Sequence, residues 1–313
     1  MKELRIVFMG TPQFAIPSLE KIFHSEHKLV GIVTQPDRPR GRGQNLLPQP
    51  VKRFAIDHHI EPILQPLSLK DEYFIADLRK LEADLFVVVA FRILPDVVFD
   101  MAPKGSINLH PSLLPNYRGA APINWAIIKG EKITGVTIIY IRKEIDAGNI
   151  ILQKKEPLHE DDTAGTLHDR LSKVGADLLM KAIDNIAENK VQTYSQNPEL
   201  VTKAPKLTAE MTHLNFDQPA LNVKNWIHGL SPFPGAYGIH NGSQIKFYRA
   251  SIIDKDYKNG IPGSVNRINK NQLWINCNPG IISILELQLE GRRKLKIEEF
   301  LRGYKIKEND YFV

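Results

Sequence analysis

Three polar side chains of different chemistry stand where the sequence predicts a strand and the loops that follow strands. Asn108 and His110 alternate with apolar residues over 106–110, a pattern that predicts a short strand. Residues two apart on a strand project from the same face about 7 Å apart, so this amide and this imidazole can reach one small group. Asp146 adds a carboxylate from a later loop. Together they suit acyl transfer to an amine, because that reaction needs a hydrogen-bond donor for an oxyanion and a route for a proton.

The strand that carries Asn108 belongs to a series of apolar segments separated by segments of helical periodicity. The expected strands are residues 4–9, 28–34, 84–90, 106–110 and 135–141, and the expected helices include residues 16–23 and 166–188. Strands that alternate with helices predict an α/β fold with a doubly wound, mostly parallel sheet. In such sheets ligands bind in the loops after the carboxyl ends of the strands. We therefore expect the loop that begins at Pro111 to line a ligand site.

The pattern changes in the last third of the chain. Residues 192–207 are polar and contain two prolines. Short alternating segments follow at 245–250, 272–277 and 281–287. Turn sequences such as Asn241-Gly242 separate them, which predicts a small β-barrel. Most of the net charge of +6 lies here, since 15 Lys and Arg stand against 10 Asp and Glu after residue 205. A basic face on a small domain is typical of nucleic-acid binding, although it also fits a domain that is merely soluble.

Bulk properties narrow the class of protein. At 313 residues the chain is long enough for two domains. It has neither an apolar segment long enough to span a membrane nor a segment typical of a secretion signal, so we expect a cytoplasmic protein. The single cysteine, Cys277, excludes an intramolecular disulfide and a multi-cysteine zinc site. Neither a dinucleotide-binding nor a P-loop glycine pattern is present, so we expect no NAD and no ATP.

Several motifs resemble the transferases that use 10-formyltetrahydrofolate, and most closely those that formylate methionyl-tRNA. The matching motifs are Met9-Gly10-Thr11-Pro12, Thr34-Gln35-Pro36-Asp37-Arg38-Pro39, Gly119-Ala120-Ala121-Pro122 and Ser231-Pro232-Phe233-Pro234-Gly235-Ala236, together with the segments around Asn108 and Asp146. They extend over nearly the whole chain. The resemblance implies that Asn108, His110 and Asp146 are the catalytic residues.

The resemblance also implies where a folate binds. The residues that fall on the folate-contacting segment of the family are Ser112, Leu113, Leu114 and Pro115. With Ala90 and Phe91 they are expected to form the pterin pocket, because pterins are recognised by backbone groups in a mostly apolar slot. The segment from Ala90 to Pro95 is one residue shorter than the Ala-Tyr-Gly-x-Ile-Leu-Pro form of the family. 10-Formyltetrahydrofolate is expected as the co-substrate, and no metal is expected.

A segment rich in glycine and proline, residues 36–43, carries Arg38, Arg40 and Arg42. This composition is poor for regular structure but suits an arm that meets phosphates. In the resembling family the segment contacts the acceptor end of initiator tRNA, and Arg42 aligns with the arginine of its Gly-Arg-Gly motif. Initiator methionyl-tRNA is therefore the expected partner. Taken alone, the same segment would be an ordinary solvated loop.

The resemblance further implies the order of the domains. A Rossmann-like formyltransferase catalytic domain is expected over residues 1–189, a linker over 190–207, and an OB-like β-barrel that binds tRNA over 208–313. The protein is expected to be a monomer.

Three other functions share some of these features. A formyltransferase that acts on an amino-sugar nucleotide would share the three catalytic residues, but it would not need the basic C-terminal domain or the Arg42 segment. An enzyme that hydrolyses 10-formyltetrahydrofolate with water would share them as well. A non-catalytic RNA-binding paralogue would retain the fold but would have no need of Asn108, His110 and Asp146 together.

Overall fold

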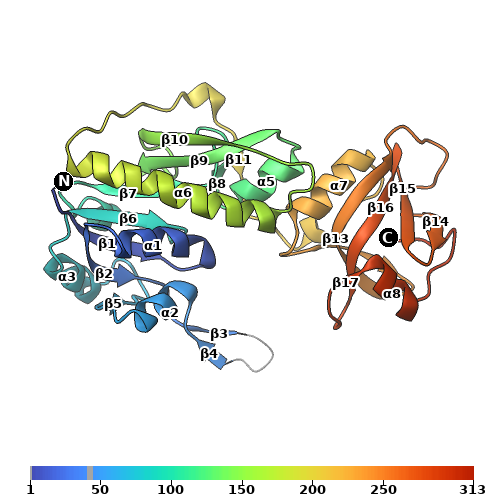
Figure 1. Cartoon of the computed structure of the whole chain (residues 1–313), viewed down its shortest axis with the longest axis horizontal. Coiled ribbons are helices and arrows are strands. Elements are labelled where there is room, and N and C mark those ends of the chain that lie inside the picture. The colour runs from blue at the N-terminus through green and yellow to red at the C-terminus, as the bar shows by residue number, and fades with distance from the viewer. Residues whose placement is uncertain (1, 41–44) are drawn as a thin grey trace. The chain divides into compact units, whose positions relative to one another are not determined.

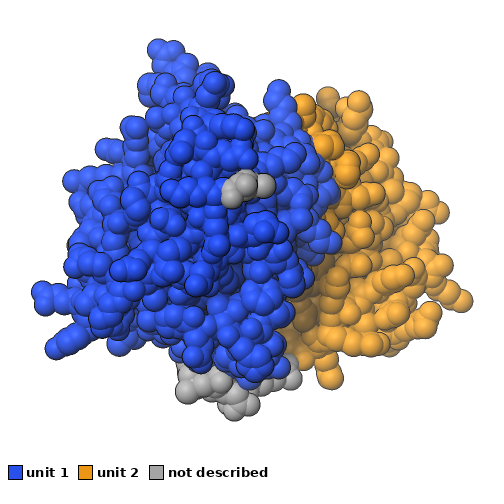
Figure 2. Space-filling view, turned by 60° about the vertical axis from the view of Figure 1, so that its left-hand side comes forward, with its two compact units in different colours: residues 1–119, 134–156, 168–204 blue, residues 120–133, 157–167, 205–313 orange. Residues whose placement is uncertain are grey.

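The computed structural model describes residues 2–40 and 45–313, with side chains for residues 2–37 and 47–313. The chain forms two compact units, which are blue and orange in Figure 2. Unit 1 consists of residues 1–119, 134–156 and 168–204, and unit 2 consists of residues 120–133, 157–167 and 205–313. The bounds expected from the sequence for the catalytic domain, the linker and the C-terminal domain stay a prediction.

A seven-stranded sheet forms the centre of unit 1 (Figure 1). In spatial order its strands are β10 (Ile150–Pro157), β9 (Ile133–Tyr140), β7 (Ser106–His110), β6 (Leu85–Val89), β1 (Arg5–Gly10), β2 (Lys28–Val33) and β5 (Ile63–Leu64). The pairs from β7 to β5 are parallel, whereas β9 runs antiparallel to β7. All five strands expected from apolar patterning are present, and the doubly wound, mostly parallel α/β fold is confirmed.

The strands β5 and β10 were not expected from the sequence. β5 has only two residues, too few for any pattern to show. β10 lies at one edge of the sheet, and its second half is polar and largely exposed. An edge strand with solvated side chains lacks the apolar alternation by which strands are found, so its place depends on backbone pairing.

Helices cover both faces of the sheet in unit 1. On one face, α3 (Glu72–Lys80) and α4 (Asp96–Phe99) pack against apolar side chains of β1 and β6. On the other, Figure 1 shows α1 (Ile16–Phe23) and the long helix α6 (Ala164–Ala187) lying along the sheet. A Cβ at Gly175 of α6 would lie 2.7 Å from Cδ2 of Leu109, so this glycine lets α6 approach β7 closely. Because side chains alternate along a strand, Asn108 and His110 project away from α6.

Shorter elements complete unit 1. They are η1 (Gln13–Ala15), β3 (Arg38–Arg40), β4 (Asn45–Leu47), α2 (Pro50–Asp57), β8 (Arg118–Gly119), η2 (Pro198–Leu200) and β11 (Lys203–Ala204). The segment whose composition was poor for regular structure contributes β3, which pairs antiparallel with β4. A two-stranded ribbon leaves one edge of each strand unpaired, so it tolerates Pro39, which has no N–H to donate.

Unit 2 is built on an antiparallel sheet. Its strands are β12 (Ala236–His240), β13 (Ser243–Asp254), β14 (Val265–Asn269), β15 (Gln272–Cys277), β16 (Gly280–Leu289) and β17 (Leu295–Lys296). Its helices are α5 (Pro122–Ile128), α7 (Ala220–Gly229), α8 (Ile297–Gly303) and the single turn η3 (Glu210–Thr212). The turn at Asn241-Gly242 joins β12 to β13, and both of its residues have positive φ, as a tight hairpin turn requires.

The two outer strands of this sheet, β12 and β14, do not pair with each other within the described part of the chain, but residues 309–313 hydrogen-bond to the backbone beside both. Val313 exchanges two backbone hydrogen bonds with Ile239 of β12, and the carbonyl of Asp310 accepts one from Val265 of β14. The arrangement is consistent with the OB-like barrel expected from the sequence. None of the helices in the described ranges is long and apolar enough to cross a membrane.

The core of unit 2 gives a test of its stability. Phe247 is completely buried, and its ring lies 6.0 Å from that of Phe216 and 5.5 Å from that of Phe312. Phe247→Ala should lower the free energy of unfolding of unit 2 by about 3–5 kcal/mol, through lost burial and a cavity. The three tryptophans of the chain all lie in unit 2, so tryptophan fluorescence in a denaturant titration reports on this unit.

Phe233 supplies the matched control, because its side chain is 82% exposed. Phe233→Ala should leave the denaturation midpoint nearly unchanged. Equal effects of the two substitutions would contradict the packing described for Phe247.

Candidate active site

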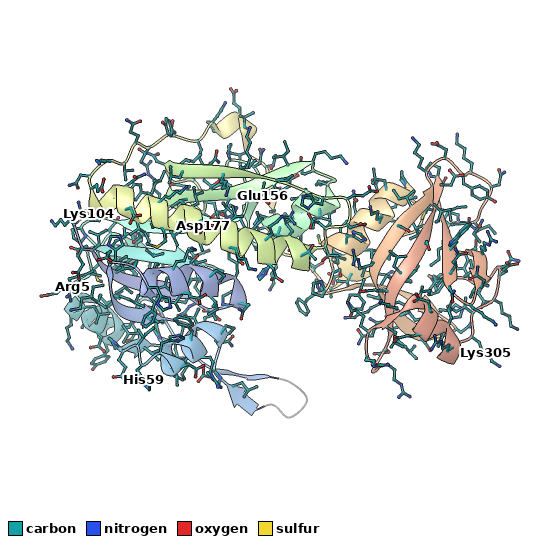
Figure 3. All side chains as sticks on the ribbon, in the orientation of Figure 1. Arg5, His59, Lys104, Glu156, Asp177 and Lys305 are labelled. Atoms are coloured by element: carbon teal, nitrogen blue, oxygen red, sulfur yellow. The ribbon has the colours of Figure 1, made fainter. Side chains whose placement is uncertain are left out.

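The carboxyl ends of the parallel strands share one end of unit 1. Arg5, at the amino end of β1, and Lys104, just before β7, lie together at the opposite end (Figure 3). His110 is the last residue of β7, and it pairs with Thr137 of the antiparallel neighbour β9. Asn108 pairs with Val88 of β6 and with Ile139 of β9. Both residues therefore sit where ligands bind in sheets of this kind.

Asn108 is half-buried. Within the described ranges its side-chain amide has no hydrogen-bond partner from the protein. An amide that is partly withdrawn from water and has no internal partner can donate to a ligand at little cost in lost protein contacts. This is the property expected of a donor to an oxyanion.

The structure brings His110 and Asp146 together, as the sequence predicts. Nδ1 of His110 lies 3.6 Å from Oδ1 of Asp146, and their side chains are 5% and 13% exposed. Oδ2 of Asp146 accepts a hydrogen bond of 2.9 Å from the backbone N–H of Gly119. Asp146 itself has a φ of +53°, so its loop holds it in a left-handed conformation that few non-glycine residues adopt.

The protonation of His110 follows from its partners. Nε2 lies 3.0 Å from the carbonyl oxygen of Tyr117, which can only accept, so Nε2 carries a proton and donates it. Burial lowers the pKa of His110 below its ordinary value of 6.5, and the charge of Arg118 also lowers it. The Asp146 carboxylate and the Tyr117 carbonyl raise the pKa against these effects. A neutral ring therefore presents the unprotonated Nδ1 to Asp146.

The segment from Ser112 to Pro115 begins two residues after His110 and is held by side chains of β9 and β10. Oγ1 of Thr137 donates to the carbonyl of Ser112 at 2.6 Å and accepts from the N–H of Leu114 at 3.1 Å. Nε2 of Gln153, on β10, donates to the carbonyl of Leu114 at 2.7 Å and to Oγ1 of Thr137 at 3.0 Å. Ser112 and Leu114 are buried, whereas Leu113 and Pro115 are half-buried.

The second expected folate segment follows the neighbouring strand β6. Ala90 is exposed and has a φ of +48°, and Phe91 is half-buried. The guanidinium of Arg92 donates to the carbonyls of Pro66 and Leu67 at 2.8 and 3.0 Å and lies 5.3 Å from the centre of the Phe91 ring. Because β6 and β7 are adjacent and parallel, both expected folate segments begin at the same end of the sheet, where the carboxyl ends of these strands lie.

The structure describes the arginines that are expected to contact tRNA only in part. Arg38 and Arg40 lie on β3, but only their backbone is described. Arg42 lies outside the described residues. The role expected for the three arginines stays a prediction.

Sequence reasoning missed the side chains that hold the site in place. Thr137 and Gln153 pin the loop after His110, and Gln196 bonds to the loop of Asp146. Thr137 could have been found by its antiparallel pairing with His110 once the strands were placed. Gln153 and Gln196 stand in polar surroundings and give no local signal. Within the described ranges, no group of three or more His, Cys, Asp or Glu residues is placed to hold a metal ion.

Comparison with known families shows which family the chain belongs to. A family model described as formyl transferase matches residues 4–183, and one described as formyl transferase, C-terminal domain, matches residues 206–305. The chain is 43% identical over 307 residues to the methionyl-tRNA formyltransferase of Syntrophus aciditrophicus, covering 98% of each chain. It is 41% identical over 308 residues to that of Acetivibrio thermocellus, covering 98% of this chain and 99% of the other.

Solved structures share the fold at lower identity. A crystal structure of HypX from Aquifex aeolicus in complex with tetrahydrofolic acid superposes with a TM-score of 0.67 at 18% identity, over 99% of this chain and 51% of that one. An N-formyltransferase from Helicobacter canadensis, in complex with folinic acid and dTDP-3-aminofucose, superposes with a TM-score of 0.66 at 21% identity, over 90% of this chain and 98% of the other. On the family models and the identities over nearly the whole length, the chain belongs to the formyl transferase family of enzymes, among the methionyl-tRNA formyltransferases.

Proposed function

We propose that this chain transfers the formyl group of 10-formyltetrahydrofolate to the α-amino group of methionine on initiator methionyl-tRNA. The observation that carries the proposal is the similarity over 98% of the chain to relatives named methionyl-tRNA formyltransferase. The gathering of an amide, an imidazole and a carboxylate at the end of β7 agrees with that chemistry.

Asn108 is proposed to stabilise the negative charge that develops on the formyl oxygen during the transfer. When the amine attacks the formyl carbon, the carbonyl oxygen becomes an oxyanion, and the bond between this carbon and the folate nitrogen then breaks. The unpartnered amide of Asn108 donates to that oxygen. A donor fixed before the reaction is more effective than water, because no reorganisation is needed as the charge appears.

His110 and Asp146 act as one acid–base pair in this proposal. The attacking amine must lose a proton, and the folate nitrogen must gain one. The proton enters at Asp146, which is the more exposed partner, and is shared with Nδ1 of His110 at 3.6 Å. Since burial keeps His110 neutral, the pair can accept this proton. It then donates the proton to the leaving nitrogen of the folate.

The folate is proposed to bind along the residues named above for the two segments after β6 and β7. Ser112, Leu113, Leu114 and Pro115 offer backbone groups on a rigid loop, and Ala90 and Phe91 face the same edge of the sheet. HypX binds tetrahydrofolic acid on a related fold, which supports a folate here. The chemistry assigned to the three polar side chains needs no metal.

The tRNA is proposed to meet two basic regions. Arg38, Arg40 and Arg42 would contact phosphates near the acceptor end, and the excess positive charge after residue 205 would attract the rest of the acceptor arm. An amino-sugar nucleotide is a weaker candidate, because the likeness to the Helicobacter canadensis enzyme is one of fold at 21% identity. Action on initiator tRNA would place the enzyme in the cytoplasm, and a monomer stays the expected state.

The proposal is tested by transfer of labelled formyl from 10-formyltetrahydrofolate to purified Met-tRNA, with initiator and elongator tRNAs compared. We expect formylation confined to the initiator. Asn108→Ala should then lower kcat by about 10²–10³-fold, because one oxyanion donor is lost. Gln192→Ala removes an exposed amide of the same unit and should leave the rate unchanged.

Other outcomes of this assay favour the other functions. Turnover of the folate without Met-tRNA would indicate the hydrolase, and transfer only to an amino-sugar nucleotide would indicate that class of enzyme. Binding of tRNA without any transfer would indicate the non-catalytic paralogue.

The electrostatic coupling of the pair can be measured directly. Asp146→Asn removes the carboxylate that raises the pKa of His110 against burial, so His110 should titrate at a lower pH in this variant than in the wild type. NMR of the imidazole ring during a pH titration gives the value. Glu144→Gln removes an exposed carboxylate from the same loop and should not move the titration. An unchanged midpoint in Asp146→Asn would show that the two side chains do not interact.

The proposed tRNA contact predicts an effect on binding rather than on chemistry. Arg42→Ala should raise the KM for Met-tRNA by about tenfold or more at unchanged kcat, because a charge-assisted bond to phosphate is lost. It should also reduce the slope of log affinity against log salt by about 1. Arg53→Ala is the control, because Arg53 is an exposed arginine of α2 paired with Asp57. A KM equal to that of the control would remove Arg42 from the interface.

A further inference from the structure

A segment near the end of unit 1 connects the two loops that hold the catalytic pair. Residues 193–204, here called the strap, follow α6 and run past both loops. One is the loop of residues 116–119, which supplies the carbonyl of Tyr117 to His110 and the N–H of Gly119 to Asp146. The other is the loop of residues 144–149, which carries Asp146.

Backbone contacts fix the strap at both ends. Near its start, Tyr194 exchanges two backbone hydrogen bonds with Ile150, at 2.8 and 2.9 Å. At its end, β11 pairs in parallel with β8. Thr202 adds two further contacts, since its Oγ1 accepts from the N–H of Tyr117 and its carbonyl accepts from the N–H of Arg118. The strap is therefore an integral part of the site.

Gln196 is the side chain of the strap that reaches the loop of Asp146. It is half-buried, whereas its neighbours from residue 192 to residue 200 are exposed. Its Nε2 donates to the carbonyls of Asp146 and Gly148, at 2.8 Å each. Its Oε1 accepts from Nε and Nη2 of Arg118, at 3.1 and 2.6 Å.

The orientation of this amide follows from the chemistry of its partners. A guanidinium only donates and a carbonyl only accepts, so the oxygen of Gln196 must face Arg118 and its nitrogen must face the two carbonyls. One side chain thus ties the loop of residues 116–119 to the loop of residues 144–149. These hydrogen bonds of Gln196 to Arg118 and to the carbonyls of Asp146 and Gly148 are here called the clamp. A residue held at a φ of +53° needs such contacts, because its backbone would otherwise relax to a commoner conformation.

We propose that Gln196 is a positioning residue that holds Asp146 against His110 through the backbone of residues 146–148. The inference rests on the proposed formyl transfer as the activity by which it is measured. Gln196 acts through Asp146, and its effect is on the geometry of the acid–base pair. Loss of the clamp should therefore lower kcat and leave the KM for Met-tRNA largely unchanged.

The pH dependence separates this role from a merely structural one. The charged groups that act on His110 are Asp146, which raises its pKa, and Arg118, which lowers it. When the clamp is lost, Asp146 is less well held and raises the pKa of His110 less, so burial lowers that pKa further. In Gln196→Ala, which adds no charge, the limb of the kcat profile that reports His110 should then move to lower pH.

Gln196→Ala and Gln196→Glu test the proposal by formyl transfer at saturating folate and Met-tRNA. The Ala variant removes both halves of the clamp. The Glu variant keeps the partner of Arg118 but replaces the donor to the two carbonyls with a carboxylate that they repel. Both should lose about 10- to 100-fold in kcat, as misplacement of a reacting group by about 1 Å does. Ser195→Ala, at an exposed neighbour, should match the wild type.

The outcomes of the two proposals are distinct. If the wild type transfers no formyl group, the proposed function fails. If the wild type is active and Gln196→Glu is as fast as Ser195→Ala, the positioning role is refuted. If Gln196→Ala does not fold, the comparison of Gln196→Glu with Ser195→Ala still decides. In Gln196→Ala, a fall in kcat without the shift in pH would also overturn the assignment, since Asp146 would then still act on His110 as before.

Discussion

The buried contact between His110 and Asp146 is the constraint on which the rest of unit 1 depends. An imidazole and a carboxylate withdrawn from water interact strongly, but only while their separation is held. Burial favours the neutral ring, and the carboxylate favours the charged one. The two effects oppose each other within one pair, so a displacement of Asp146 away from the ring would lower the pKa of His110 further. The surrounding structure is therefore built to prevent that displacement.

Close backbone packing provides much of this rigidity. A Cβ at Gly119 would lie 2.6 Å from the carbonyl oxygen of Ala204, and one at Gly148 would lie 1.6 Å from that of Tyr140. Neither position can carry a side chain without moving the strap or the loop of Asp146. Thr137 and Gln153 fix the loop after His110 in the same way, through hydrogen bonds to its backbone. Thr137, Gln153 and Gln196 thus hydrogen-bond chiefly to backbone groups of the loops. Within the described residues none of them bonds to the side chain of Asn108, whose amide can therefore donate to a ligand.

The two units of the chain differ in the type of sheet on which each is built. Unit 1 supplies a parallel sheet whose strand ends bring distant residues together, as a site for small-molecule chemistry requires. Unit 2 supplies a small antiparallel sheet with a phenylalanine core, and its residues after 205 carry most of the excess positive charge of the chain. Charge spread over a stable small domain suits a long polyanion, whose phosphates need many weak contacts and little shape. The proposed acceptor, a tRNA, would use both.

The sequence by itself determined the strands that have an apolar pattern, the polar trio and the family to which its motifs point. The shared face of Asn108 and His110 was predictable because residues two apart on a strand project from the same side. The edge strand β10, the folding of residues 193–204 onto the loops of residues 116–119 and 144–149, and the contacts of Gln196 were not. Their side chains are polar and partly solvated, so local composition carries no signal for them. Only the tertiary structure places Gln196 beside Asp146, 50 residues away, because that contact is made between backbone and side-chain hydrogen-bonding groups and not by burial of apolar surface.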